Sequence, residues 1–142
     1  MDLPLANEHR AKAEAFQRRH RTEVLTLLFT DMLGSARLKQ ELGDLRAVTL
    51  IEAHEALFRQ LLAGFPEAEE VDKTGDSYFA IFARPSDAVR FALLLQSRLR
   101  RLGKEHGHVV MDRVGITSAK CWSGVRPTAS TFTEYRSTPP RG

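Results

Sequence analysis

Four short segments of the chain are predicted to be strands: 24–30, 69–72, 77–82 and 109–116. The first of them is apolar or β-branched throughout, which predicts a strand buried on both faces, and Asp31 ends it. A tight turn at 73–75 joins the second and third segments into a hairpin, so that Asp76 stands at the start of its second arm.

Apolar residues recur at helical spacing in three segments between these strands: 35–42, 44–63 and 85–102. Ser35 and Asp44 are placed to cap two of these helices, and Gly103 is placed to end the last. Residues 1–21 are polar and favour a helix, which predicts a helical lead-in. The order of strand, two helices, hairpin, helix and strand predicts an α/β (α+β) fold with a ferredoxin-like sheet.

Composition excludes several classes of protein. With 142 residues, 42% of them hydrophobic and 27% charged, the chain fits one globular domain. Its apolar stretches are too short to cross a bilayer and its N-terminus does not follow the pattern of a secretory signal, so we expect a cytoplasmic protein without a membrane partner. The single cysteine, Cys121, excludes an internal disulfide bond. The net charge is only +3 and no aromatic residues interleave with the basic ones, which argues against a nucleic-acid partner.

Two aspartates carry the candidate chemistry, because Asp31 and Asp76 each stand at the mouth of a short strand. A sheet that brings two carboxylates together can hold two divalent metal ions, which can drive chemistry on a nucleoside triphosphate. Taken singly, Asp31 is also explained as a cap after a strand and Asp76 as a turn residue. The histidines have no metal-like partner at helical spacing, which favours structural roles for His54, His106 and His108.

Several motifs in a fixed order resemble one family: Phe29-Thr30-Asp31-Met32-Leu33-Gly34-Ser35, Leu42-Gly43-Asp44, Lys73-Thr74-Gly75-Asp76-Ser77-Tyr78-Phe79-Ala80, Asp87-Ala88-Val89 and Arg113-Val114-Gly115-Ile116. Together they look like a class III adenylate/guanylate cyclase catalytic domain over about residues 22–116. The resemblance implies the ferredoxin-like palm fold of nucleotide cyclases and, for an intact domain, a homodimer.

The resemblance also implies an activity, the conversion of ATP or GTP to a 3′,5′-cyclic nucleotide and pyrophosphate in intracellular signalling. In this family two metal ions, Mg or Mn, lower the pKa of the ribose 3′-hydroxyl and neutralise the leaving pyrophosphate. The matching metal ligands are Asp31, the backbone of Met32, and Asp76. The loop that leads into the next helix is expected to bind phosphate through its backbone N–H groups, at Leu33, Gly34, Ser35 and Ala36.

Purine recognition departs from the family pattern. Many adenylate cyclases place a lysine four positions before the second metal aspartate, where this chain has Asp72, and Lys73 lies one position nearer. Lys73 is explained equally well as a purine-binding residue and as an ordinary turn lysine. The choice between ATP and GTP therefore stays open.

The tail departs further. After Ile116 the family continues to an Asn/Asp-x-Ala-Ala-Arg helix that carries the ribose-orienting side chain and the transition-state arginine, whereas residues 117–142 contain no such segment and show no helical or strand period. We expect a domain that is incomplete at its C-terminus, with an irregular tail and very low turnover, since each lost donor to transition-state charge costs a factor of about 100 to 1,000.

Two alternatives remain beside a cyclase. One is a non-catalytic cyclase-homology module for dimerisation or regulation. The other is a diguanylate cyclase relative, which is disfavoured because the Gly-Gly-Asp/Glu-Glu-Phe signature is absent where Thr74-Gly75-Asp76-Ser77-Tyr78 stands.

A shifted reading frame explains the tail. If each codon takes the third base of one residue and the first two bases of the next, residues 119–123 can spell Glu-Val-Leu-Val and residues 132–142 can spell His-Gly-Val-Pro-Phe-Asp-Thr-Ala-Ala-Arg. We therefore predict a single-base deletion or sequencing error just after the Ile116 codon. Reading the nucleotides of the gene checks this, and the hypothesis fails if the alternative frame does not encode Asp-Thr-Ala-Ala-Arg.

Overall fold

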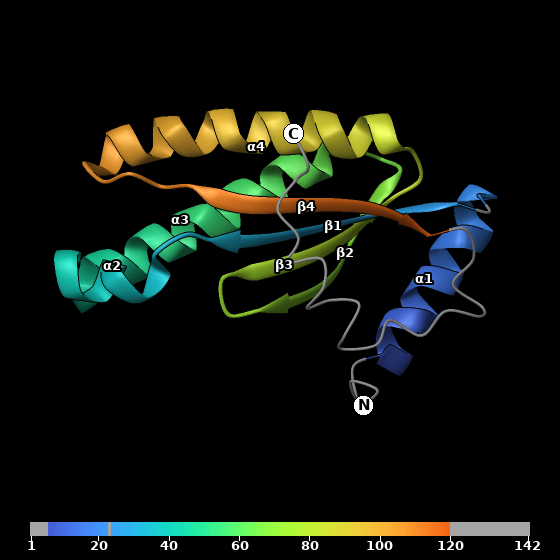
Figure 1. Ribbon diagram of the computed structural model, residues 1–142, viewed down its shortest axis with the longest axis horizontal. Coiled ribbons are helices and arrows are strands. Elements are labelled where there is room, and N and C mark those ends of the chain that lie inside the picture. The colour runs from blue at the N-terminus through green and yellow to red at the C-terminus, as the bar shows by residue number, and fades with distance from the viewer. Residues whose placement is uncertain (1–5, 23, 120–142) are drawn as a thin grey trace, which may run out of the picture.

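A four-stranded antiparallel sheet forms the centre of the molecule (Figure 1). The structure, a computed structural model, describes residues 6–22 and 24–119. The strands are β1 (Leu25–Met32), β2 (Ala68–Thr74), β3 (Ser77–Phe82) and β4 (Asp112–Ala119). They lie in the order β2-β3-β1-β4, which confirms the predicted ferredoxin-like topology and places β1 between β3 and β4.

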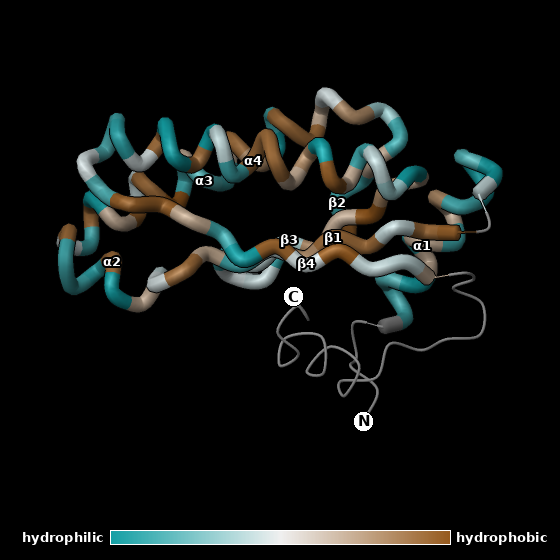
Figure 2. The backbone as a smooth tube through the Cα atoms, turned by 45° about the horizontal axis from the view of Figure 1, so that its top comes forward, coloured by the Kyte–Doolittle hydropathy of each residue, from teal (hydrophilic) through white to brown (hydrophobic). Residues whose placement is uncertain are grey.

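Helices α3 (Asp44–Ala63) and α4 (Pro85–His106) cover one face of the sheet, and α2 (Ser35–Leu42) lies beyond the C-terminal end of β1 (Figure 1). Figure 2 shows the reason, because hydrophobic positions run along the strands and alternate with hydrophilic ones along α4. Phe58 of α3 stacks on Tyr78 of β3 with ring centroids 4.2 Å apart, and it meets Phe91 of α4 edge-on at 5.2 Å. This aromatic contact joins both helices to the sheet.

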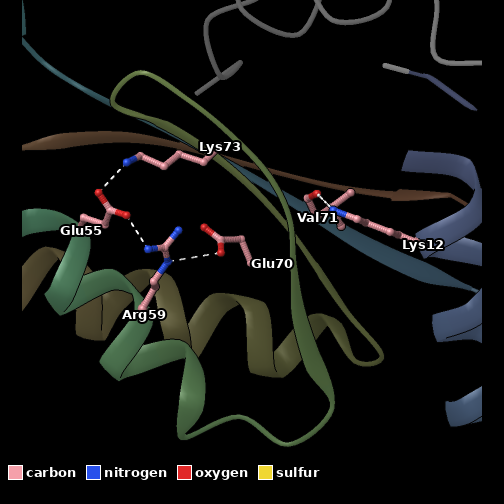
Figure 3. A network of polar contacts seen from close by, with 6 residues as sticks. All are labelled: Lys12, Glu55, Arg59, Glu70, Val71 and Lys73. Atoms are coloured by element: carbon pink, nitrogen blue, oxygen red, sulfur yellow. Dashed lines mark hydrogen bonds and ion pairs between the residues drawn. The ribbon is translucent and has the colours of Figure 1, made fainter. Parts of the chain in front are cut away.

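Helix α1 (Ala6–His20) packs on the opposite face. Its Phe16 is fully buried with Leu25 and Val71 of the sheet. A bulge between Glu70 and Asp72 interrupts the β2–β3 ladder, and the Val71 carbonyl oxygen in this bulge accepts a 2.8 Å hydrogen bond from Lys12 Nζ (Figure 3). The predicted lead-in helix is therefore anchored to the sheet.

Several predicted boundaries move. Ser35 and Asp44 begin their helices, and a glycine without a side-chain cap precedes each of them. Helix α4 continues through Gly103, where a β-carbon would lie 2.4 Å from the carbonyl oxygen of His108, and it ends before Gly107, whose φ is +67°. Gly103 therefore serves a close backbone approach and does not end the helix.

Strands β1 and β2 are longer than the sequence predicts, β3 has its predicted bounds, and β4 begins at Asp112 and not at the predicted residue 109. Strand β2 reaches Thr74, so Asp76 lies in the two-residue turn before β3 and not in its first position. Strand β4 includes Thr117 through Ala119, which the sequence assigned to the irregular tail, because these residues pair with β1. The rest of that tail lies outside the described residues. Within the described ranges, no helix is long and apolar enough to cross a membrane.

The packing of α1 predicts a stability effect for Phe16. Because Phe16 is fully buried, Phe16→Ala is expected to lower the free energy of unfolding by about 3 kcal/mol. Urea denaturation measures this. Arg18→Ala, an exposed change on the same helix, is the matched control and is expected to stay within about 0.5 kcal/mol. Equal stability of both variants and the natural chain would mean that α1 does not pack on the sheet in solution.

Candidate functional site

The sheet brings the two aspartates to one corner. Side chains alternate along β1, so Asp31 shares a face with Leu25 and Leu27, opposite α3 and α4. The register pairs Asp31 with Ser77 of β3, and Asp76 directly precedes Ser77 in the turn. Residues that are 45 positions apart in the chain, 31 and 76, thus become neighbours across two strands.

Arg113 completes this corner, and the sequence reading missed its part. Strand β4 places Arg113 directly opposite Asp31, and its Nε and Nη2 donate hydrogen bonds of 2.9 and 3.0 Å to the two carboxylate oxygens. These bonds and the carboxylate charge raise the pKa of Arg113. The Asp31 side chain is only 14% exposed, whereas that of Arg113 is 68% exposed. Arg113 stands in a family motif, but its pairing depends on the β1–β4 register.

Asp76 contributes a buried oxygen atom that lacks a hydrogen-bond partner in the described part of the chain. Its Oδ2 is buried and has no hydrogen-bond partner among the described residues. A buried polar atom without a partner costs roughly 1–3 kcal/mol, and a charged one more. Carboxylate oxygens are preferred ligands of Mg²⁺. The unpaired Asp76 oxygen, one residue from the register partner of Asp31, therefore fits a divalent cation.

The protein donors at this corner are few. Across residues 6–22 and 24–119, no group of three or more histidine, cysteine, aspartate and glutamate side chains is placed to hold a metal ion. Mg²⁺ usually keeps several waters and binds through one or two carboxylates together with substrate phosphates. A site of two carboxylates therefore suits a metal that arrives with a nucleotide better than a permanently caged one.

The loop after Asp31 fits the predicted phosphate site in part. The Met32 side chain is buried in the core, and its backbone ends β1. The N–H of Leu33 donates a 2.8 Å hydrogen bond to the Met111 carbonyl oxygen, so this group is already in use. Gly34, Ser35 and Ala36 enter α2 without a side-chain cap, which leaves the first turn suited to an anion.

Lys73 lies away from the aspartate corner. Strand alternation turns it to the helix-covered face, where its Nζ bonds Glu55 of α3 and lies 6.0 Å from the Tyr78 ring centroid (Figure 3). The Lys73 hydrogen bond holds the pKa of Glu55 below its ordinary value. Asp72 lies on the open face, by which we mean the face opposite α3 and α4 that α1 covers only in part, and it pairs with His9 of α1 at 3.2 Å. Of the two candidate purine residues, only Asp72 shares the face of Asp31.

A cavity of about 470 Å³ lies elsewhere, between α3 and α4. Leu57, Phe65, Arg90 and Arg98 are among its lining residues, and none of the lining residues belongs to β1 or to the β2–β3 turn. The cavity is therefore separate from the aspartate corner.

The chain matches one family model, described as the adenylate and guanylate cyclase catalytic domain, over residues 17–136. A bacterial light-regulated adenylyl cyclase superposes with a TM-score of 0.61 at 19% identity, over 68% of this chain and 30% of that chain. The adenylyl cyclase CyaB from P. aeruginosa gives a TM-score of 0.61 at 17% identity, over 68% of this chain and 56% of that chain. None of the curated proteins matches the sequence.

A third solved structure is the guanylate cyclase domain of RhGC from Catenaria anguillulae in complex with GTP, with a TM-score of 0.59 at 16% identity, over 68% of this chain and 56% of that chain. These likenesses show the fold and confirm the predicted palm fold of nucleotide cyclases. The chain spans 30% and 56% of the first two structures. The family match extends on both sides of the predicted segment 22–116, and the reading frame of the tail stays a prediction.

The unpaired Oδ2 of Asp76 predicts that the Asp76 carboxylate lowers the stability of the protein while serving its function. Asp76→Asn is expected to raise the free energy of unfolding by about 1 kcal/mol in the presence of EDTA, since a neutral amide costs less to bury unpaired than a carboxylate. Chemical denaturation measures this. Glu52→Gln, which removes an exposed carboxylate from α3, is the control and should leave stability unchanged. A less stable Asp76→Asn protein would show that the Asp76 carboxylate is satisfied in solution.

Proposed function

The chain belongs to the adenylate and guanylate cyclase catalytic domain family, and we propose on this basis that it carries the metal-binding half of a nucleotide cyclase site. The intact domain would convert ATP or GTP to a 3′,5′-cyclic nucleotide and pyrophosphate in intracellular signalling. The observation that carries this proposal is the buried, unpaired Oδ2 of Asp76 beside Asp31.

Asp31 and Asp76 are the proposed side-chain ligands of two divalent cations, Mg or Mn, with the backbone of Met32 as a further donor. When bound, such ions would supply positive charge that lowers the pKa of the ribose 3′-hydroxyl and neutralises the leaving pyrophosphate. One carboxylate stands on β1, which is paired on both sides, and the other stands in a two-residue turn between paired strands.

Arg113 has a proposed double role. In the structure its guanidinium neutralises Asp31 through two parallel hydrogen bonds. A guanidinium fork binds phosphate oxygens as well as carboxylate oxygens, and Arg113 is the exposed partner of the pair. When Asp31 binds a metal ion, we expect Arg113 to release Asp31 and to bind the triphosphate. Gly34, Ser35 and Ala36 would add backbone N–H groups to the same phosphates.

The chain as written is proposed to turn over very slowly. Its sequence has no Asn/Asp-x-Ala-Ala-Arg segment, so the ribose-orienting side chain and the transition-state arginine are missing. In an intact domain a second copy would supply the complementary half of each site in a homodimer. Lys73 and Asp72 are the proposed candidates for purine contact, and of these Asp72 lies on the same face as Asp31.

The missing segment also favours a second candidate, a non-catalytic cyclase-homology module for dimerisation or regulation. Such a module would bind its partner whether or not Asp31 and Asp76 are present. The two candidates therefore differ in what removal of the carboxylates does.

Metal binding tests the proposal. The natural chain is expected to bind Mn²⁺, measured by the loss of the free Mn²⁺ signal in electron paramagnetic resonance, and Asp31→Asn or Asp76→Asn is expected to abolish this binding because each removes a ligand charge. Glu52→Gln should bind as the natural chain does. In a frame-restored version the two aspartate variants should also lose cyclic nucleotide formation. A natural chain that binds no Mn²⁺, or ordinary cyclase rates from the chain as written, would contradict the proposal.

A further inference from the structure

The proposed chemistry does not use a buried histidine–aspartate pair that lies on the helix-covered side of the sheet. His54 of α3 and Asp112 of β4 have side chains that are 1% and 0% exposed. His54 Nε2 lies 2.8 Å from both carboxylate oxygens of Asp112. The sequence reading gave His54 a structural role, and its partner could not be identified because the two residues are 58 positions apart.

Asp112 stands where β4 begins, and α3 and α4 both hold it. Its side chain is bound by His54 of α3, and its carbonyl oxygen accepts a 2.7 Å hydrogen bond from Gln96 Nε2 of α4. Asp112 pairs in register with Met32, the last residue of β1. The start of an edge strand is thereby fastened to the helical layer.

The residues on either side of Asp112 reach the aspartate corner. The preceding residue, Met111, accepts the hydrogen bond from the N–H of Leu33, which begins the loop after β1. The following residue, Arg113, binds Asp31 on the open face. Because side chains alternate along β4, fixing Asp112 on one face also fixes Arg113 on the other.

Stability alone does not explain this pair. Taking an ionisable pair out of water costs several kcal/mol for each ion, and well-packed apolar residues of similar volume often hold a core equally well. The pair fixes the placement of β4 relative to α3. A hydrogen bond between two defined groups sets their separation and orientation, whereas apolar contact does not.

We propose that His54 and Asp112 are positioning residues that hold the start of β4 so that Arg113 and the loop after Asp31 keep the geometry of the metal and phosphate site. This inference rests on the proposed function. Neither side chain touches the metal or the nucleotide; both act through the Met111 carbonyl group and Arg113.

Two measurements test this on the full chain. The double variant His54→Leu/Asp112→Val replaces the buried pair by apolar side chains of similar total volume, so it is expected to fold, as circular dichroism and thermal unfolding will show. Hydrogen exchange at the Leu33 amide is expected to quicken about tenfold or more, while exchange within β2 and β3 stays unchanged. Mn²⁺ affinity is expected to fall about tenfold or more, as it does when residues that orient metal ligands are lost.

Two controls separate positioning from packing. His54→Gln, whose amide can donate to Asp112, is expected to recover much of the Leu33 protection and Mn²⁺ affinity. Thr26→Val removes another buried polar group on the same face of the sheet, whose Oγ1 has no partner among the described residues, and should change neither readout.

The outcomes distinguish the two proposals. A folded double variant with unchanged Leu33 exchange and Mn²⁺ affinity overturns the positioning role. Quickened exchange in the double variant, in a protein whose natural form binds no Mn²⁺, supports the fastening of β4 and overturns the metal site. If the double variant does not fold, Gln96→Leu decides instead, because it removes the hydrogen bond to the Asp112 carbonyl group. Lower Mn²⁺ affinity in the folded Gln96→Leu protein supports positioning, and an unchanged affinity overturns it.

Discussion

The register of β1 between its two neighbours is the constraint on which the rest of the structure depends. Leu28 turns to the core beneath α3 and α4, and Asp31, three positions later, turns to the open face. The same register sets Asp31 opposite Ser77 on one side and Arg113 on the other. A slip of one residue would exchange the two faces, placing carboxylates in an aromatic core and core residues in water. Core packing therefore fixes the geometry of the candidate site.

The corner that results is electrostatically uneven. Asp31 has a guanidinium partner, whereas the Oδ2 of Asp76 has none among the described residues. A protein selected for stability alone would pair or neutralise that oxygen. Buried side chains on both faces of the sheet offset the cost of burying that oxygen, with Phe58 in contact with Tyr78 and Phe91 beneath the two helices and Phe16 packed against Leu25 beneath α1.

The sequence predicted what depends on local pattern. The apolar run before Asp31 indicated a buried strand, and the order of the elements predicted the sheet topology, because both follow from periodicity and turn residues. Contacts that depend on register were not predicted. The Arg113–Asp31 pair joins residues 82 positions apart, and the direction of Lys73 depends on which face β2 presents after its bulge. No local signal in the sequence distinguishes these alternatives, and the family motifs placed the aspartates without placing their partners.

Helix α1 covers only one end of the open face, and this limits how the described residues could enclose a nucleotide. Helix α1 buries Phe16 against Leu25 at the N-terminal end of β1, whereas at the C-terminal end of the same strand Arg113 stays 68% exposed. Asp31 and Asp76 supply negative charge at this corner, and the guanidinium group of Arg113 faces water, so a metal-bound triphosphate could approach. The described residues around the corner are too few to enclose it. Enclosure of a triphosphate would then draw on residues from outside these elements. Under the proposed function, this corner is the half of a site that holds charge, and a second copy would supply the half that orients the sugar.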